Sequence, residues 1–266
     1  MYLNAERIAV ANQAVQDTFE QSSIAWQAIP HWDTGDPGQF RVRSDYAYAT
    51  VPTPATDVAP PLTGDSLELE AQSVRFAITV AQATAPTHDA LLAAVIARTV
   101  QLAGSVDSEV IGELLSNATG SVTTTWAIQD LLNALIDARA KLETAGYRSP
   151  SCLLTDTTGL KSLNDLQSGL SDYQPLLDAA NINSVYRFDE FGPPNQGRML
   201  LLGRRQRIAH GGAAAASPGE EPVDLAVSVP PSLEVVGETN DGNIEMAVRI
   251  RFAPRVTDIN GFVDVV

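Results

Sequence analysis

The longest helical pattern in the chain lies in residues 87–115. Apolar residues recur there at three- and four-residue spacing: Leu91, Leu92, Val95, Ile96, Val100 and Leu102 before Gly104, and Val106, Val110, Ile111, Leu114 and Leu115 after it. This spacing predicts a helix whose apolar stripe is wider than that of a surface helix, so we expect cover on more than one side. We expect Thr87 to cap its start and Gly104 to mark a kink or a stop.

Two alternating patterns precede this helix and predict a hairpin. Apolar and aromatic residues alternate with Arg41, Arg43 and Asp45 over residues 40–48, and Leu67, Leu69 and Ala71 alternate with Glu68 and Glu70. Residues 50–65 between them contain four prolines, which are unsuited to strand pairing, so they form the tip. Across such a hairpin Arg41 and Arg43 can face Glu68 and Glu70. The hairpin has an apolar face with no evident partner in its own chain, so we expect another subunit to cover it.

The alternation changes phase after this hairpin. Leu67, Leu69 and Ala71 are odd-numbered, whereas the apolar residues Val74, Phe76, Ile78 and Val80 are even-numbered. A slip of one residue moves the apolar set to the other face of a strand, so we predict a bulge or bend near residues 72–73. One segment then belongs to two sheets, and its second half packs on the long helix.

The remaining patterns predict a first helix, an inserted lobe and a group of returning strands. Residues 3–23 read as a helix capped by Asn4. Residues 124–145 form a second strong helix ended by Gly146, and a strand at 151–155, a helix capped by Asp156 and strands at 183–188 and 199–202 complete the lobe. Strands at 223–229, 233–238, 244–252 and 261–265 follow without a helix of their own, so we expect them to cover the long helix.

The composition argues against some classes of function but does not identify one. The formal net charge of −15, with two lysines against fifteen arginines, argues against binding nucleic acid through bulk charge. The single cysteine, Cys152, allows no disulfide within the chain and lies in an apolar segment, so we expect it to be buried. We find no secretory signal, and the longest apolar run, residues 90–97, is shorter than a membrane span. We therefore expect a protein made in the cytosol.

Motifs for chemistry are weak throughout. Asp33-Thr34-Gly35 matches the aspartic-protease triplet, but prolines flank it and favour a turn. His210-Gly211-Gly212 lacks an accompanying G-x-S-x-G nucleophile motif. The three histidines and Cys152 do not have metal-like spacing, and no nucleotide-binding glycine motif is present. We therefore predict no catalytic, cofactor-binding or metal-binding residue.

One basic cluster stands out in the second half of the chain. Arg204, Arg205 and Arg207 lie together, with Arg198 nearby. Three interpretations are open: salt bridges to an acidic neighbouring subunit, contact with packaged DNA, or a solvated turn.

The order of these elements resembles the major capsid protein fold of tailed bacteriophages, which encapsulin shell proteins share. Five segments carry the likeness: QFRVRSDYAYAT, SLELEAQSVRFAITV, SVDSEVIGELL, WAIQDLLNALIDARAKLETAGYRSPSCLLTDTTGL and EVVGETNDGNIEMAVRIRFAPRVTDINGFVDV. The resemblance covers nearly the whole chain and rests on element order rather than on one motif.

The resemblance implies an α+β fold with four parts. Residues 1–30 would be an N-terminal arm, and residues 31–72 an extended hairpin loop. Residues 73–120 and 223–266 would form a peripheral domain around a long spine helix, and residues 121–222 an inserted α/β axial domain. Because the helical arm starts almost at Met1, we expect either a separate scaffolding protein or none.

The implied function is assembly rather than catalysis. Copies of the chain would form pentamers and hexamers that close into an icosahedral shell around double-stranded DNA, without sequence-specific contacts and without a membrane. Portal and decoration proteins are further expected partners, and the location is the virion, assembled in the host cytoplasm. Two alternatives remain: an encapsulin-type compartment that holds cargo protein, and a soluble α+β enzyme. The expected subunit-interface residues are Arg41, Arg43, Tyr46, Tyr48, Glu68, Glu70, Arg204, Arg205 and Arg207.

A first prediction concerns covalent cross-linking. Some members of the capsid family link subunits through a lysine in the extended loop, whereas residues 31–70 here contain no lysine. We therefore expect assembled particles to run as a single band near 28 kDa on a denaturing gel. A ladder of linked subunits would contradict this expectation.

Overall fold

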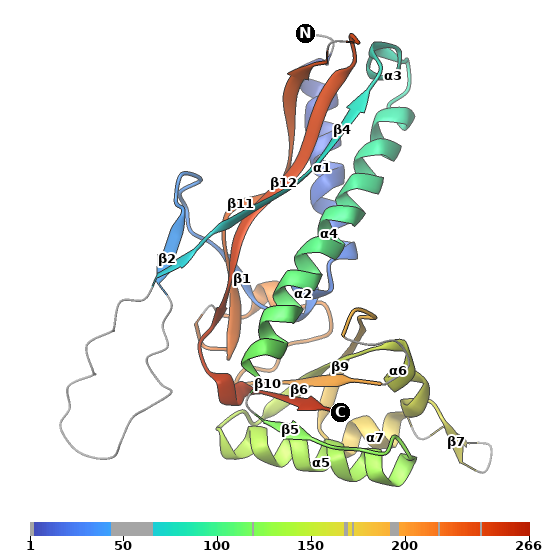
Figure 1. The fold of residues 1–266 in the computed structure, drawn as a ribbon, viewed down its shortest axis with the longest axis vertical. Helices are drawn as coiled ribbons and strands as arrows, with labels where there is room; N and C mark the ends of the chain where they lie inside the picture. Colours follow the sequence, from blue (N-terminus) through green and yellow to red (C-terminus); the bar gives the residue numbers. More distant parts are fainter. Residues whose placement is uncertain are drawn as a thin grey trace, which may run out of the picture.

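A computed structural model describes residues 3–43, 66–118, 120–167, 170–171, 173–191, 197–217, 219–239 and 241–266. It has the mixed helix-and-sheet class that the sequence predicts. An elongated module, built from a long sheet and the helices packed on it, ends in a broader lobe (Figure 1). The N-terminus lies near the far tip of the elongated module, and the C-terminus lies in the lobe (Figure 1).

The helix α4 (Asp89–Asn117) runs for 29 residues along the elongated module. It continues through Gly104, so the predicted stop at that residue is wrong. Gly104 lies on the exposed side, while its neighbours Leu102, Ala103 and Val106 are buried and hold the helix on both sides of it. The cap position is His88, which makes no side-chain cap bond, so the predicted cap at Thr87 is also wrong.

One face of α4 is covered within the chain. Helices α1 (Ala5–Ser22) and α2 (Ile24–Ala28) pack on it, as do strands β4 (Glu70–Ile78) and β12 (Ile244–Val256). The prediction that strands cover the long helix is confirmed. Cover on every side is not complete within the chain, because Ile96 and Val100 remain 42% and 49% exposed. By length and composition α4 is also the one described helix that could cross a membrane, but its buried face belongs to the core of the chain.

The long sheet has the strand order β1-β11-β12-β4. Strand β1 (His31–Asp33) runs parallel to β11 (Val223–Glu238), and the other pairs are antiparallel. The even-numbered residues of β12 from Ile244 to Phe252 are all buried, which confirms the predicted return of the chain onto α4. Strand β11 is one strand rather than the two predicted, because a register shift between Val229 and Ser232 accommodates two prolines.

The segment belongs to two sheets, as predicted, but the change falls near residue 70 rather than near residues 72–73. Strand β3 (Ser66–Glu68) pairs with β2 (Arg41–Arg43), whereas β4 pairs with β12. The break falls at Leu69, and β4 keeps an unbroken register from Glu70 opposite Phe252 to Ile78 opposite Ile244. The bulge predicted near residues 72–73 is therefore wrong.

The lobe is built on a five-stranded sheet of order β5-β13-β10-β6-β9. Its strands are β5 (Ser121–Val122), β13 (Phe262–Val265), β10 (Met199–Arg204), β6 (Ser149–Thr155) and β9 (Ile182–Arg187). We expected the last strand on the long helix, but β13 lies between β5 and β10. All four of its residues are buried, which suits an inner strand covered on both faces.

The helices of the lobe are α5 (Ile128–Thr144), α6 (Thr157–Leu163) and α7 (Tyr173–Ala179). Trp126 has a positive φ of 65° and precedes α5, so the helix begins later than the predicted range of residues 124–145. Gly146, with φ of 96°, follows the C-cap of α5, which confirms the predicted end of that helix. Asp156 accepts a hydrogen bond from the Gly159 backbone N–H, which confirms the predicted cap of α6. The helix α6 ends at Leu163.

The smaller elements connect these layers. They are α3 (Val80–Thr84), the short strands β7 (Leu166–Gln167) and β8 (Leu170–Ser171), and the 3₁₀ turns η1 (Ala213–Ala215) and η2 (Ile259–Gly261).

Both faces of the lobe sheet are buried, which joins the lobe firmly to the elongated module. Leu153 and Leu201 face the layer that contains α5 and α7. Cys152, Leu154 and Leu202 face the other way and belong to the same apolar cluster as α4, α1 and β12. The two parts of the molecule therefore share one continuous core.

A buried carboxylate fixes the N-terminal helices on α4. The Asp107 side chain is 3% exposed and accepts hydrogen bonds from Ser23 Oγ (2.6 Å), the Ala25 N–H (2.9 Å) and the Ile24 N–H (2.9 Å). These backbone donors are the free N–H groups at the start of α2. Burial raises the pKa of Asp107 to about 6, and the three hydrogen bonds oppose that rise.

Replacing this carboxylate tests its part in the fold. Asp107→Ala leaves three inward-facing donors without their acceptor, so we expect a loss of about 3 kcal/mol in the free energy of unfolding. The folded-state pKa lies above the unfolded one, so the stability that Asp107 contributes is lost as pH rises from about 4 to about 6. The difference between wild type and variant, measured by chemical denaturation, should therefore be larger at pH 4 than at pH 7.

Ser105→Ala provides the matched control on the same helix. Ser105 is exposed and bonds only back to the Gln101 carbonyl, so its loss should change stability by less than about 0.5 kcal/mol. Equal effects of the two substitutions would contradict the assignment of Asp107 as the anchor.

Candidate functional site

The hairpin base, which we define as β2 and β3, projects from one side of the long sheet (Figure 1). Arg41 lies opposite Glu68, as predicted, and Arg43 lies opposite Ser66 rather than Glu70. Glu70 instead starts β4 and pairs with Phe252. All four charged residues, Arg41, Arg43, Glu68 and Glu70, are exposed. Tyr46 and Tyr48 lie outside the described residues.

The apolar side of the hairpin base is covered by its own chain. Val42 and Leu69 are each 4% exposed and pack against Ala226 of β11 and Ala253 of β12. Trp32 and Leu67 lie at the edge of this cluster. The expectation that another subunit must cover this face is therefore wrong for Val42. Phe40, just before β2, is 61% exposed and is not part of this cluster.

A buried ion pair lies beside this cluster. Asp224 of β11 is fully buried, and both its oxygens accept from Arg255 of β12, at 2.7 Å from Nε and 2.6 Å from Nη2. The same carboxylate accepts from Trp32 Nε1 (3.1 Å) and from the Gly219 N–H (2.8 Å). A bidentate pair with its remaining lone pairs used is the geometry in which a buried charge is well compensated.

Arg255 extends this pair to the hairpin base. Its guanidinium carbon lies 4.9 Å from the centre of the Trp32 ring, and its Nη1 donates to the carbonyl of Arg43 at 3.3 Å. One side chain thus contacts strands β11 and β1 of the long sheet and the first strand of the hairpin.

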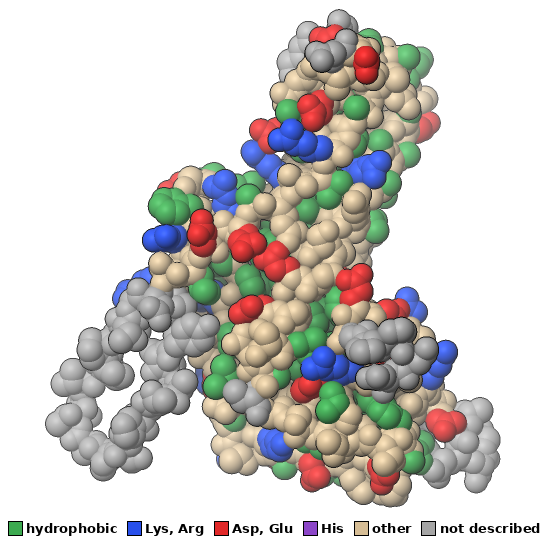
Figure 2. Space-filling view, in the orientation of Figure 1, with side chains coloured by type: hydrophobic (Ala, Val, Ile, Leu, Met, Phe, Trp, Pro, Cys, Tyr) green, Lys and Arg blue, Asp and Glu red, His purple; other side chains and the backbone are tan. Residues whose placement is uncertain are grey.

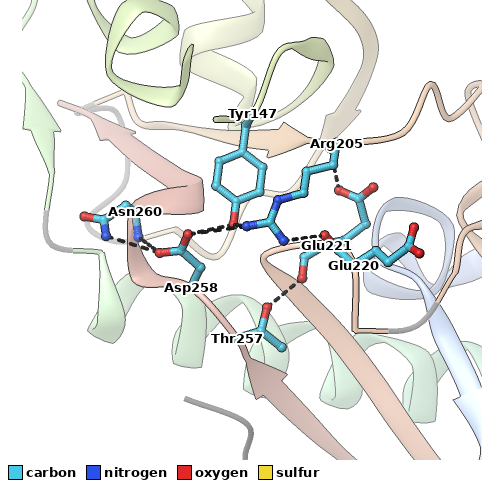
Figure 3. A network of polar contacts seen from close by, with 7 residues as sticks. All are labelled: Tyr147, Arg205, Glu220, Glu221, Thr257, Asp258 and Asn260. Atoms are coloured by element: carbon cyan, nitrogen blue, oxygen red, sulfur yellow. Dashed lines mark hydrogen bonds and ion pairs between the residues drawn. The ribbon is translucent and has the colours of Figure 1, made fainter. Parts of the chain in front are cut away.

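A second polar network joins the lobe to the long sheet (Figure 3). We call it the junction network, and its members are Tyr147, Arg205, Glu220, Glu221, Thr257, Asp258 and Asn260. Tyr147, which follows α5, donates its hydroxyl hydrogen to Asp258 Oδ2 at 2.8 Å and accepts from Arg205 Nη2 at 3.1 Å. The Arg205 guanidinium also lies over the Tyr147 ring, 4.7 Å from its centre.

Glu221 closes this network from the other side. Its carboxylate accepts from the backbone N–H groups of Arg205 (3.0 Å) and Gln206 (2.9 Å), and its carbonyl accepts from Thr257 Oγ1 (2.6 Å). Burial raises the pKa of Glu221, and these backbone hydrogen bonds oppose the rise. Burial is also the largest cause that raises the pKa of Tyr147, and the hydrogen bond to Asp258 raises this pKa further. The network sits where the chain passes from β10 to β11 and from β12 to β13.

The predicted basic cluster is therefore dispersed. Arg204 is 3% exposed and donates to the carbonyls of Ile208 and Ala28, both at 3.1 Å, so it points into its own subunit. Arg205 belongs to the junction network, and Arg198 forms an ion pair with Asp264 at 2.6 Å. Arg207 is exposed. The face drawn in Figure 2 carries basic and acidic side chains interspersed, without one large basic area.

The weak motifs are structural in this fold. The Asp33 carboxylate accepts from the Gly35 N–H at 2.8 Å, and Gly35 has a φ of 77°, which is a turn. His31 stacks on Trp26 with 3.7 Å between ring centres, and burial lowers its pKa to about 4. His210 stacks on Tyr186 at 4.4 Å.

The described residues contain neither a reactive thiol nor a cluster of metal-binding side chains. Cys152 is buried as predicted, and burial raises the pKa of its thiol to about 11, which keeps it protonated at neutral pH. In the described part of the chain, no group of three or more His, Cys, Asp and Glu side chains is placed to hold a metal ion. A surface hollow of about 540 Å³ beside the junction network is lined by residues such as Lys141, Thr144 and Asn260.

Sequence reasoning missed both polar networks. Asp224 and Arg255 interrupt apolar strands, and a charge inside such a strand is a usable signal that it is paired. Nothing in the sequence identifies the partner, because Trp32, Asp224 and Arg255 meet only through the folding of distant segments. Tyr147 and Asp258 are 111 positions apart and give no local signal at all.

Comparison with known proteins gives no match to a family model and no match among curated proteins. Solved structures do match over nearly the whole chain. A virus-like particle from Pyrococcus furiosus is 13% identical, with a TM-score of 0.71, and the alignment covers 98% of this chain and 100% of that one.

Two further structures agree with it. The mature capsid of bacteriophage PhiM1 is 8% identical, with a TM-score of 0.56 and coverage of 91% and 86%. An encapsulin complex from Synechococcus elongatus is 12% identical, with a TM-score of 0.58 and coverage of 92% and 87%. At such identities the likeness concerns the fold, and it includes the elongated module and the lobe together. The chain therefore has the fold shared by the capsid proteins of bacteriophages and the shell proteins of encapsulins.

Proposed function

We propose that this chain is the major capsid protein of a tailed bacteriophage, and that it assembles through pentamers and hexamers into an icosahedral shell around double-stranded DNA. The observation that carries the proposal is the whole-chain likeness to structures named as phage capsids and virus-like particles. Both parts of the molecule take part in that likeness, so it is not the recurrence of one common motif.

The geometry of the subunit supports an assembly role. The lobe and the elongated module share one core, so the subunit can act as a rigid block in a repeated contact. The hairpin base projects from that block, and Phe40, Ile96 and Val100 are large apolar residues that the chain leaves exposed. Closed shells need such self-complementary surfaces repeated by symmetry, and they need no catalytic group.

We assign the parts of the subunit within this proposal. The arm is residues 1–30 and the extended loop residues 31–72, while the peripheral domain comprises residues 73–120 and 223–257 around α4 as the spine. The axial domain comprises residues 121–222 together with β13, because β13 completes the sheet of the lobe.

The proposed contacts to neighbouring subunits are charged and aromatic. Arg41, Arg43, Glu68 and Glu70 at the hairpin base, Tyr46 and Tyr48 beyond it, and Arg205 and Arg207 are the candidates. Arg204 is no longer among them, because its guanidinium is used inside the subunit. DNA would be enclosed without sequence-specific contacts, since a subunit of net charge −15 offers few sites for phosphate. A portal protein, a decoration protein and a separate scaffolding protein are further proposed partners, with assembly in the host cytoplasm.

The alternative function is an encapsulin-type compartment. The likeness to an encapsulin complex supports it, and such a shell would enclose protein cargo rather than DNA. A soluble α+β enzyme is the weaker alternative, because the matched structures are structural proteins.

We expect the purified chain to form large hollow particles in negative-stain electron microscopy. Sedimentation velocity should show a species of megadalton size, because interfaces repeated by symmetry close into a shell. A species of about 28 kDa at both low and high concentration, with and without co-expressed partner proteins, would contradict the shell function.

The contents of the native particle distinguish the two shells. Double-stranded DNA that resists nuclease until the particle is opened supports the capsid function. Particles that contain a defined protein and no DNA support the compartment instead.

The extended loop can be tested separately. We expect replacement of residues 50–65 by a short Gly-Ser linker to leave the melting temperature of the subunit nearly unchanged, because β2 and β3 remain paired and seated on the long sheet. Particle formation should fall at least tenfold by sedimentation. A Gly-Ser loop of the original length is the matched control, and normal assembly of the shortened variant would contradict a role for the loop.

A further inference from the structure

We propose that Arg255 is the positioning residue that sets the direction of the hairpin base relative to the long sheet, and that shell assembly depends on it although it is buried within the subunit. The first part concerns the isolated subunit, whereas the second rests on the proposed function.

Two of the contacts between the hairpin base and the rest of the subunit differ in character. The cluster of Val42, Leu69, Ala226 and Ala253 holds it by apolar packing. Such packing has no preferred direction, so small residues such as the two alanines permit a hairpin to rock or slide on them. The second attachment is directional, since it is the hydrogen bond from Arg255 Nη1 to the Arg43 carbonyl.

The orientation of Arg255 is itself fixed. Its Nε and Nη2 are held by Asp224, and the Trp32 ring lies against its guanidinium plane. Trp32 is in turn oriented by its own bond to Asp224. A planar guanidinium held on one edge and one face presents its remaining nitrogen in a fixed direction. The carbonyl of Arg43 lies in that direction.

The geometry also explains why arginine is required at position 255. A lysine has one nitrogen, so it can neutralise Asp224 but cannot bond both carboxylate oxygens and the Arg43 carbonyl in this arrangement. The charge of the pair would survive in Arg255→Lys, whereas the link to the hairpin would not. This substitution therefore separates electrostatic compensation from positioning.

The test is amide hydrogen exchange on unassembled subunits of Arg255→Lys, with Arg249→Lys as the matched control. Arg249 lies on the same strand and forms an exposed ion pair with Glu234 at 2.8 Å. We expect exchange to rise about tenfold or more in peptides that cover residues 40–43 and 66–69 for Arg255→Lys, and to stay at wild-type level in α4, β6 and β10. The control should leave all peptides unchanged.

Two outcomes would overturn the positioning role: unchanged exchange at the hairpin base in Arg255→Lys, or an equal rise throughout the subunit. If Arg255→Lys does not fold, Trp32→Phe replaces it. This milder variant keeps an aromatic face but removes the Nε1 donor to Asp224, and it should raise exchange at the same peptides.

Assembly is measured in parallel by sedimentation. Arg255→Lys should give fewer or misshapen particles, whereas Arg249→Lys should assemble normally. Normal assembly of Arg255→Lys with a loosened hairpin base would overturn the second part of the proposal. Absence of particles from the wild type would instead contradict the proposed function, and the exchange result would stand independently of it.

Discussion

The packing of β12 on α4 is the interaction on which the rest of this structure depends. Strict alternation along β12 places five apolar side chains, Ile244 to Phe252, against the buried face of the helix. Because β12 also pairs with both β4 and β11, burying this one face fixes the whole long sheet. The strand then continues toward the lobe, so the same packing decides where the last strand of the lobe sheet begins. Each Å² of apolar surface removed from water contributes about 25 cal/mol, so burial of these β12 side chains stabilises the fold more than any single polar contact described above.

Buried charged groups fix the relative orientation of segments that apolar packing alone leaves undetermined. Asp107 sets the angle of α2 on α4, Asp224 and Arg255 join three segments beside the hairpin base, and Glu221 receives two backbone donors at the junction. Each site provides its carboxylate with several donors, which offsets part of the free-energy cost of burying the group. The apolar layers contribute most of the stability, and these polar sites determine how the helices and strands are oriented relative to one another.

The local patterns of the chain were largely sufficient to predict its elements. The periodicity of α4, the alternation of β12 and the caps at Asn4, Asp156 and Gly146 identified helices and strands correctly. Errors arose where tertiary context decides. Strand β13 is buried on both faces and has three apolar residues beside Asp264, so its sequence fits either sheet. Pro230 and Pro231 suggest a strand end but lie within a register shift. The candidate site was predicted less well, because Arg204 is drawn inward by carbonyls distant in sequence and Arg255 meets Trp32 only in the folded chain.

The position of β13 has a consequence for how the protein is made. Strand β13 lies between β5 and β10 and supplies hydrogen-bond partners to both, although more than 50 residues separate it from β10 in the chain. During synthesis the lobe therefore emerges from the ribosome with a gap in its sheet, and β5 has no neighbour until residues 262–265 appear. Two exposed strand edges in an incomplete sheet are sites for pairing with other chains. The lobe sheet of the nascent subunit therefore stays incomplete until residues 262–265 have been made, so maturation of the lobe waits for a segment synthesised long after its other strands.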